Sequence, residues 1–128
     1  MLKRPCLDDF MERVGQRFEI VVFTASLGKY ADPLLDWLDR KHVIRWRLFR
    51  DACQPWEGNY VKDLSHLGRD LSKTIIIDNS PHSYCFQPNN ALPIGTFIDD
   101  MEDKELLRLL PRLHQLECVS DVRTLLSQ

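Results

Sequence analysis

The sequence predicts an α/β fold, a Rossmann-like parallel sheet flanked by helices. Two short runs, residues 19–23 and 74–77, are almost entirely apolar, which is typical of strands covered on both faces of a parallel sheet. A third run, residues 44–48, alternates apolar and basic residues as a half-exposed strand does. Segments with helical spacing of apolar residues separate these runs, and such alternation indicates an α/β fold.

The first half of the chain is expected to hold two helices and two strands. Four apolar residues mark one face of the first helix at i, i+3, i+4 and i+7: Leu7, Phe10, Met11 and Val14. The strand 19–23 follows. Asp32 can cap a helix and Pro33 suits the first helical position, so the second helix is expected to begin there and to run through Leu38. The strand 44–48 comes next.

The second half continues the alternation. Residues 63–71 are expected to be helical, because three leucines follow helical spacing: Leu64, Leu67 and Leu71. The strand 74–77 comes next, and residues 92–98 are expected to supply another strand. A stripe of leucines predicts a C-terminal helix: Leu106, Leu109, Leu110, Leu113 and Leu116. Residues 121–126 are expected to form a shorter helix.

Length and composition indicate one ordinary globular domain over residues 1–128. The chain is 44% apolar and 28% charged, with a formal net charge of -2. This charge gives no electrostatic reason to expect direct binding of nucleic acid. No apolar run approaches the roughly 20 residues that cross a bilayer, so no membrane span is expected.

The cysteines indicate the compartment. Four of them lie far apart and form no C-x-x-C pair: Cys6, Cys53, Cys85 and Cys118. This spacing does not indicate a zinc or redox motif, and unpaired thiols are typical of intracellular proteins. The N-terminal residues show no apolar core of a signal peptide. We therefore expect an intracellular protein, nuclear or cytoplasmic.

Polar residues follow two of the expected strands. Thr24 and Ser26 come after the strand 19–23, and Asp78 and Asn79 come after the strand 74–77. Ligands of open α/β sheets bind beyond the carboxyl ends of strands, so these residues are candidates for phosphate and magnesium binding. Lys62 could add a positive charge near a phosphoryl oxygen. Taken singly, each also has an ordinary interpretation as a turn, a helix cap or a solvated lysine.

The candidates lie within longer stretches that resemble one family. These stretches are VFTASLGKYADP at 22–33, GNYVKDLS at 58–65, LGRDL at 67–71 and IDNSP at 77–81. Together they resemble the small carboxy-terminal-domain phosphatases, a branch of the haloacid dehalogenase-like superfamily. The resemblance runs over the whole chain. It implies a magnesium-dependent protein serine/threonine phosphatase whose substrates are phosphoproteins with phosphorylated Ser-Pro segments, such as the C-terminal tail of RNA polymerase II.

The resemblance also implies roles for individual residues. Thr24 and Lys62 match catalytic positions, one binding phosphate through its hydroxyl and the other neutralising the transferring phosphoryl group. Asp78 and Asn79 match the motif that holds Mg²⁺. The remaining matches are to substrate-binding positions: Ala25 and Ser26 in the phosphate turn, Leu27 and Tyr30 beside an apolar pocket for a substrate proline, and Arg50 near bound substrate.

One part of the family pattern does not occur. Family members carry an apolar strand that ends in Asp-x-Asp-x-Thr, where the first aspartate is the nucleophile and the second the general acid. No Asp-x-Asp pair exists in these 128 residues, because Asp8-Asp9 and Asp99-Asp100 are adjacent pairs. Neighbouring side chains on a strand point to opposite faces, so an adjacent pair cannot replace the motif. The resemblance thus implies an N-terminally truncated form that lacks the nucleophile-bearing central strand.

Two expectations follow from this difference. The chain is expected to be inactive as a phosphatase, as a truncated isoform would be, or to serve as a non-catalytic binding module for phosphopeptides or partner proteins. The central strand of the family lies between the strands 19–23 and 74–77. Without it, the fold is expected either to be marginally stable or to pair these two strands directly.

Overall fold

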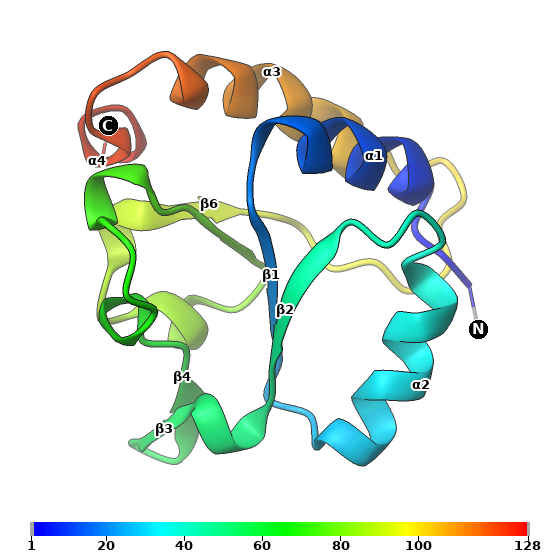
Figure 1. Cartoon of the computed structure of the whole chain (residues 1–128), viewed down its shortest axis with the longest axis horizontal. Coiled ribbons are helices and arrows are strands. Elements are labelled where there is room, and N and C mark those ends of the chain that lie inside the picture. Colours follow the sequence, from blue (N-terminus) through cyan, green and yellow to red (C-terminus); the bar gives the residue numbers. More distant parts are fainter. Residues whose placement is uncertain (1, 128) are drawn as a thin grey trace. The chain divides into compact units, whose positions relative to one another are not determined.

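Residues 2–127 are described by a computed structural model of the chain (Figure 1). Helices and short parallel sheets alternate in it, so the mixed α/β class expected from the sequence is confirmed. The chain divides into two compact units. Unit 1 comprises Met1–Ala52 and Phe97–Leu110, and unit 2 comprises Cys53–Thr96 and Pro111–Gln128. The expectation of a single domain stays a prediction.

Unit 1 is built around one pair of parallel strands. Its elements in chain order are helix α1 (Leu7–Arg17), strand β1 (Ile20–Phe23), helix α2 (Gly28–Leu38), strand β2 (Ile44–Leu48) and the 3₁₀ turn η1 (Arg50–Ala52). In Figure 1 β1 and β2 run side by side, and their register pairs Phe23 with Leu48. The first helix and both strands are thus confirmed at nearly the expected bounds.

Helix α2 begins at Gly28, five residues before the expected first position at Pro33. The Leu27 carbonyl accepts the N–H groups of Tyr30 and Ala31, both at 3.0 Å, and this starts the helix at Gly28. Pro33 therefore lies inside the helix and not at its first position. Asp32 does not cap the helix, because its carboxylate pairs with Arg47 of β2 at 2.8 Å. The ion pair between Asp32 and Arg47 therefore connects α2 to β2.

Unit 2 holds an antiparallel hairpin and a second parallel pair. The hairpin strands are β3 (Gln54–Trp56) and β4 (Asn59–Val61), and the parallel strands are β5 (Ile76–Asp78) and β6 (Ala91–Pro93). Short 3₁₀ turns connect them: η2 (Leu64–His66), η3 (Leu71–Lys73), η4 (Pro81–Tyr84) and η5 (Pro88–Asn90). A buried cluster of Leu64, Ile76 and Ala91 forms the core between these elements.

The C-terminal helices agree with the leucine pattern. Helix α3 (Glu105–Glu117) begins in unit 1 and continues into unit 2, and helix α4 (Val122–Leu126) follows. Four leucines of the predicted stripe are buried: Leu106, Leu109, Leu113 and Leu116. Asp121 caps α4, since its side chain accepts the Arg123 N–H at 2.9 Å. None of the described helices is long and apolar enough to cross a bilayer.

The prediction of a helix over 63–71 is wrong. Asp63 and Asp70 accept the N–H groups of Ser65 and Ser72, which caps two separate 3₁₀ turns. Between them Gly68 adopts a φ of +70°, a left-handed conformation that ends helical geometry. The three leucines do follow helical spacing, but they lie in or next to two short 3₁₀ turns and not in one helix. The strands predicted over 74–77 and 92–98 are also shorter, and they shift to β5 and β6.

The two predicted parallel strands do not pair with each other. Within residues 2–127, β1 pairs with β2 and β5 pairs with β6, in separate two-stranded sheets. Direct pairing of β1 with β5, one of the two expected outcomes, is therefore not observed. The other outcome, marginal stability, stays a prediction.

Candidate functional site

The predicted phosphate turn lies in unit 1, directly after β1. The Thr24 N–H donates to the Leu48 carbonyl at 2.9 Å and so extends the β1–β2 ladder by one residue. The Ser26 N–H then donates to Thr24 Oγ1 at 3.1 Å. This bond closes a tight hydroxyl turn of the kind that threonine favours. The turn therefore begins where the strand hydrogen bonds stop.

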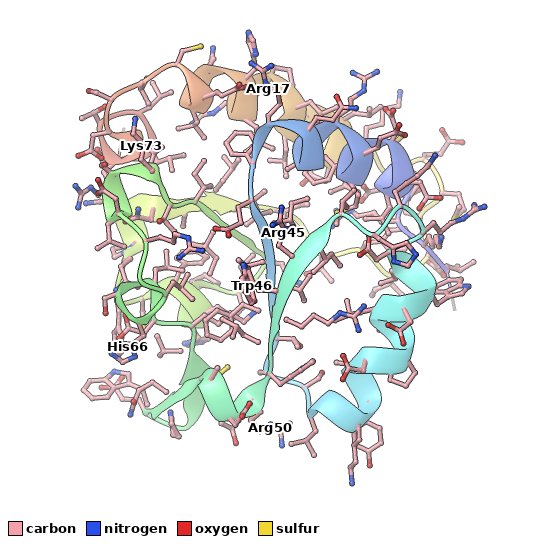
Figure 2. The ribbon with its side chains drawn as sticks, in the orientation of Figure 1. Arg17, Arg45, Trp46, Arg50, His66 and Lys73 are labelled. Carbon is pink, nitrogen blue, oxygen red and sulfur yellow. The ribbon has the colours of Figure 1, made fainter. Side chains whose placement is uncertain are left out.

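Arg50 contacts the same turn from the end of β2. Its N–H donates to the Ser26 carbonyl at 3.0 Å, and its Nε donates to the Ala25 carbonyl at 2.7 Å. Figure 2 shows Arg50 beyond the end of β2, whereas Arg45 and Trp46 lie within that strand. Unit 1 thus brings Thr24, Ala25, Ser26 and Arg50 together.

Leu27 and Tyr30 stand at the start of α2. Both side chains are exposed, at 38% and 67% of their area, and the Lys29 ammonium lies 5.1 Å from the centre of the Tyr30 ring. An exposed leucine and tyrosine one helical turn apart offer apolar area to a ligand. Their role beside a proline-binding pocket stays a prediction.

Lys62 and Asp78 form an ion pair in unit 2. Lys62 follows β4, Asp78 ends β5, and Lys62 Nζ lies 2.5 Å from Asp78 Oδ2. Both side chains are largely withdrawn from solvent, at 14% and 9% exposed. The second oxygen, Asp78 Oδ1, accepts the Ser80 N–H at 2.9 Å. Both carboxylate oxygens are therefore held in place.

Asn79 follows Asp78 in sequence, and its side chain is bonded to a residue of the segment after β6. Its Nδ2 donates to Thr96 Oγ1 at 3.1 Å. Asp78 and Asn79 together present hard oxygen donors, which fit Mg²⁺ because this ion takes one or two protein carboxylates and fills its other positions with water or substrate. Among residues 2–127 no group of three or more His, Cys, Asp or Glu side chains is arranged to hold a metal. The donor chemistry fits magnesium, with one carboxylate supplied by this chain.

Asp63, the neighbour of Lys62, has a pKa below its usual value. Burial alone would raise this pKa, but hydrogen bonds to the carboxylate from Ser65 and Gln87 outweigh it. Gln87 Nε2 donates to Asp63 Oδ1 at 2.8 Å, and Gln87 Oε1 accepts the Leu64 N–H at 3.0 Å. The ionised form of Asp63 is therefore favoured. Asp63 also caps the turn η2, which begins two residues after Lys62.

Several supporting residues were missed from the sequence. Lys62 donates its N–H to the Ser83 carbonyl at 2.8 Å, which fixes the backbone that carries the ammonium. Ser80 could have been found, because an aspartate before a turn commonly accepts the N–H two residues on. Ser83 and Thr96 carry no such local pattern. Lys62, Asp78 and Asn79 lie in unit 2 and the phosphate turn lies in unit 1, so their common action stays a prediction.

Comparison with known proteins gives the family. The family model described as NLI interacting factor-like phosphatase matches residues 1–123. A probable C-terminal domain small phosphatase of Dictyostelium discoideum is 59% identical over 128 residues, which cover 100% of this chain and 42% of that protein. The mouse carboxy-terminal domain RNA polymerase II polypeptide A small phosphatase 2 is 58% identical over 128 residues, covering 100% of this chain and 47% of that protein.

The human C-terminal domain small phosphatase-like protein is 58% identical over 126 residues, covering 98% of this chain and 46% of that protein. The chain thus spans less than half the length of these three relatives. Both the family model and the identities extend over nearly all of the chain. The chain belongs to the NLI interacting factor-like phosphatases, as a member of the C-terminal domain small phosphatase family.

Proposed function

We propose that this chain carries the phosphate-binding and cation-binding part of a magnesium-dependent protein serine/threonine phosphatase. Its substrate class is a phosphoserine followed by proline, as in the C-terminal tail of RNA polymerase II, for which the mouse relative is named. Such a substrate fits a protein of the nucleus or cytoplasm. By itself the 128-residue chain binds phosphate and does not hydrolyse it.

The observation that carries the proposal is the Lys62–Asp78 pair, 2.5 Å long and largely withdrawn from solvent. Removing two charges from water is costly, so such a pair contributes little net stability, and withdrawn charged groups at a strand end are candidates for a functional site. The pair stands at the carboxyl end of a parallel strand, where α/β proteins bind ligands. If a phosphate dianion and a divalent cation bound together, Lys62 would pair with the phosphate and Asp78 with the cation, so two new ion pairs would replace the present one.

Each residue has a defined task in the proposed mechanism. Lys62 places its ammonium on a phosphoryl oxygen and offsets the negative charge of the dianion. In unit 1 the turn at Thr24 offers a hydroxyl and backbone N–H groups that suit phosphate oxygens. That it serves the same phosphate as Lys62 is implied by the family resemblance alone. Asp78 and Asn79 would hold Mg²⁺ through their oxygens. When bound, this ion supplies positive charge that orients the phosphate.

Hydrolysis needs a nucleophile that the 128 residues do not contain. The family reaction passes through an aspartyl-phosphate, and no Asp-x-Asp pair is present to form one. Loss of a nucleophile lowers turnover by about a million-fold in the best-studied case, which is about 8 kcal/mol. We therefore expect binding without turnover from these residues.

The absence of the nucleophile motif favours a second candidate, a phosphopeptide-binding module that competes for the partners of the active enzymes. Its ligand would be the same phosphorylated Ser-Pro segment. The two candidates differ in one respect only. A longer product with the Asp-x-Asp-x-Thr strand would be an enzyme, whereas a binding module needs no such strand.

Titration of the chain with a phosphoserine-proline peptide, followed by calorimetry in the presence of Mg²⁺, tests the proposal. We expect saturable binding, and we expect Lys62→Met to weaken it about tenfold or more, the value of one charge-assisted hydrogen bond. Lys41→Met, which removes an exposed lysine far along the sequence from the proposed site, should bind as the wild type does. Failure of the folded wild-type chain to bind the peptide would contradict the proposal.

A further inference from the structure

We propose that Arg50 is a positioning residue that sets the conformation of the turn formed by Thr24, Ala25 and Ser26. The inference rests on the proposed function, in which this turn binds phosphate, and it assigns Arg50 a task in the absence of substrate. All the atoms that carry it lie in unit 1. Figure 2 shows where Arg50 stands, past the carboxyl end of β2.

Three hydrogen bonds join the turn to the segment 48–50. The Thr24 N–H donates to the Leu48 carbonyl at 2.9 Å, and the Arg50 N–H donates to the Ser26 carbonyl at 3.0 Å. The third bond runs from Arg50 Nε to the Ala25 carbonyl at 2.7 Å and is the shortest of the three. Each of the three turn residues thus has one backbone group bonded to this segment. The bonds to Thr24 and Ser26 come from the backbone of the segment, whereas the bond to Ala25 comes from the Arg50 side chain.

The bond to Ala25 also orients backbone donors. A peptide group is planar and trans, so the carbonyl of one residue and the N–H of the next point in opposite directions. Because Arg50 holds the Ala25 carbonyl, it fixes the direction of the Ser26 N–H, which donates to Thr24 Oγ1 at 3.1 Å. The Arg50 N–H fixes the Leu27 N–H in the same manner through the Ser26 carbonyl. Arg50 therefore presets two N–H groups and the hydroxyl of Thr24.

Arginine suits this task better than lysine does. The Nε–H lies part of the way along the side chain, in a rigid plane with the rest of the guanidinium, so it can hold a carbonyl while the charged end extends further. Lysine keeps the charge and has no donor at that place. An Arg50→Lys variant consequently separates the positioning bond from the charge.

The test is amide hydrogen exchange of the full chain, followed by NMR without any ligand. In Arg50→Lys we expect the Ser26 amide to exchange about tenfold faster, as for the loss of one hydrogen bond to a charged group. The bond from the Arg50 N–H to the Ser26 carbonyl belongs to the backbone and is kept in this variant. Arg50→Met, which has no donor anywhere along its side chain, should give a similar acceleration. Arg45→Lys, at an exposed arginine within β2, is the matched control and should leave exchange of the Ser26 amide unchanged.

The β2 amides report whether each variant stays folded, because their ladder to β1 does not use the Arg50 side chain. Unchanged exchange at Ser26 in both Arg50 variants would overturn the inference. Titration with inorganic phosphate then separates the two claims. If the wild type does not respond to phosphate but exchange still accelerates in the variants, the proposed function fails and the positioning role of Arg50 stands.

Discussion

Asn90 shows how one buried polar side chain can hold several turns. It is 2% exposed, and its Nδ2 donates to the carbonyls of Leu71 at 2.7 Å and Thr74 at 2.8 Å. Leu71 begins η3 and Thr74 follows it, shortly before β5. Asn90 thus fixes the path of the chain just before the strand that ends at Asp78.

Replacement of Asn90 should therefore be costly. Asn90→Ala leaves two carbonyls near the core without their donor and is expected to destabilise the chain by about 3 kcal/mol. Urea unfolding measures this loss. Asn89→Ala, at the exposed neighbouring asparagine, should change the free energy of unfolding by less than about 0.5 kcal/mol. Equal stability of the two variants would contradict this role of Asn90.

Asp103 joins the start of α3 to the N-terminal segment. Arg4 donates from Nε and Nη2 to the two Asp103 oxygens, both at 2.9 Å, and the Glu105 N–H donates to Oδ1 at 3.1 Å. The side chains of Arg4 and Asp103 are 14% and 10% exposed. The Arg4 guanidinium, with smaller help from the Glu105 N–H, holds the pKa of Asp103 below its usual value.

The lowered pKa of Asp103 predicts a pH dependence of stability. A carboxylate with a lowered pKa in the folded state stabilises the fold above its unfolded pKa of about 3.9, and this stabilisation disappears as the pH falls through the folded pKa. Asp103→Asn should thus be less stable than wild type at pH 7, with the difference shrinking below a pH of about 4. Urea midpoints across this range, with Asp99→Asn as control, test it. A difference that does not depend on pH would contradict the prediction.

The β3–β4 hairpin is the element that the sequence analysis missed. Glu57 and Gly58 connect its strands with φ of +49° and +79°, and positive values at both positions are typical of a type I′ turn. Asn-Gly is the preferred pair for this turn, and Glu-Gly is a weak form of the same pattern. The three-residue strands gave no alternation long enough to predict.

This turn geometry leads to opposite expectations at its two residues. Apart from its two chain neighbours, no residue places a heavy atom within 4 Å of a Cβ built on Gly58, so Gly58→Ala is expected to destabilise by about 1 kcal/mol through backbone strain alone. Glu57→Asn is expected to stabilise by about 0.5 kcal/mol, because asparagine tolerates a positive φ better. Thermal unfolding of both variants measures the two effects. A neutral Gly58→Ala would show that the turn does not need glycine.

Long elements with clear periodicity were predictable from the sequence, and capped turns were not. Helix α1 and strand β2 could be recognised because their side chains follow one period over their whole length. At α2 the capping pattern at Asp32 was misleading, since Arg47, which is distant in sequence, binds that carboxylate. The helix predicted over 63–71 was wrong because Asp63 and Asp70 each cap a short 3₁₀ turn.

The candidate site was predictable in part. Strand ends followed by Thr24 and Asp78 showed where polar groups should lie, and the structure pairs Asp78 with Lys62. The hydrogen bonds that Lys62 donates to Ser83 and Asn79 donates to Thr96 depend on contacts between segments far apart in sequence. Such contacts leave no periodic trace, so single residues of this kind cannot be identified from a pattern.

At the scale of the whole molecule, both parallel sheets are small. Among the described residues each holds two strands, so each of β1, β2, β5 and β6 has one edge without a ladder partner. The chain matches 42% to 47% of the length of its relatives in Dictyostelium and mouse, which leaves room in those proteins for further strands. The proposal that a strand ending in Asp-x-Asp-x-Thr completes the enzyme agrees with these unpaired edges.

Hydrolysis of p-nitrophenyl phosphate by the 128-residue chain, measured with Mg²⁺ and again with EDTA, tests the central claim most directly. We expect no turnover above background in either case, because the chain has phosphate-binding groups and no aspartyl nucleophile. A version extended by an N-terminal strand ending in Asp-x-Asp-x-Thr should gain turnover that EDTA abolishes, and its Asp-to-Asn counterpart at the first aspartate should not. EDTA-sensitive turnover by the unextended chain would contradict the account.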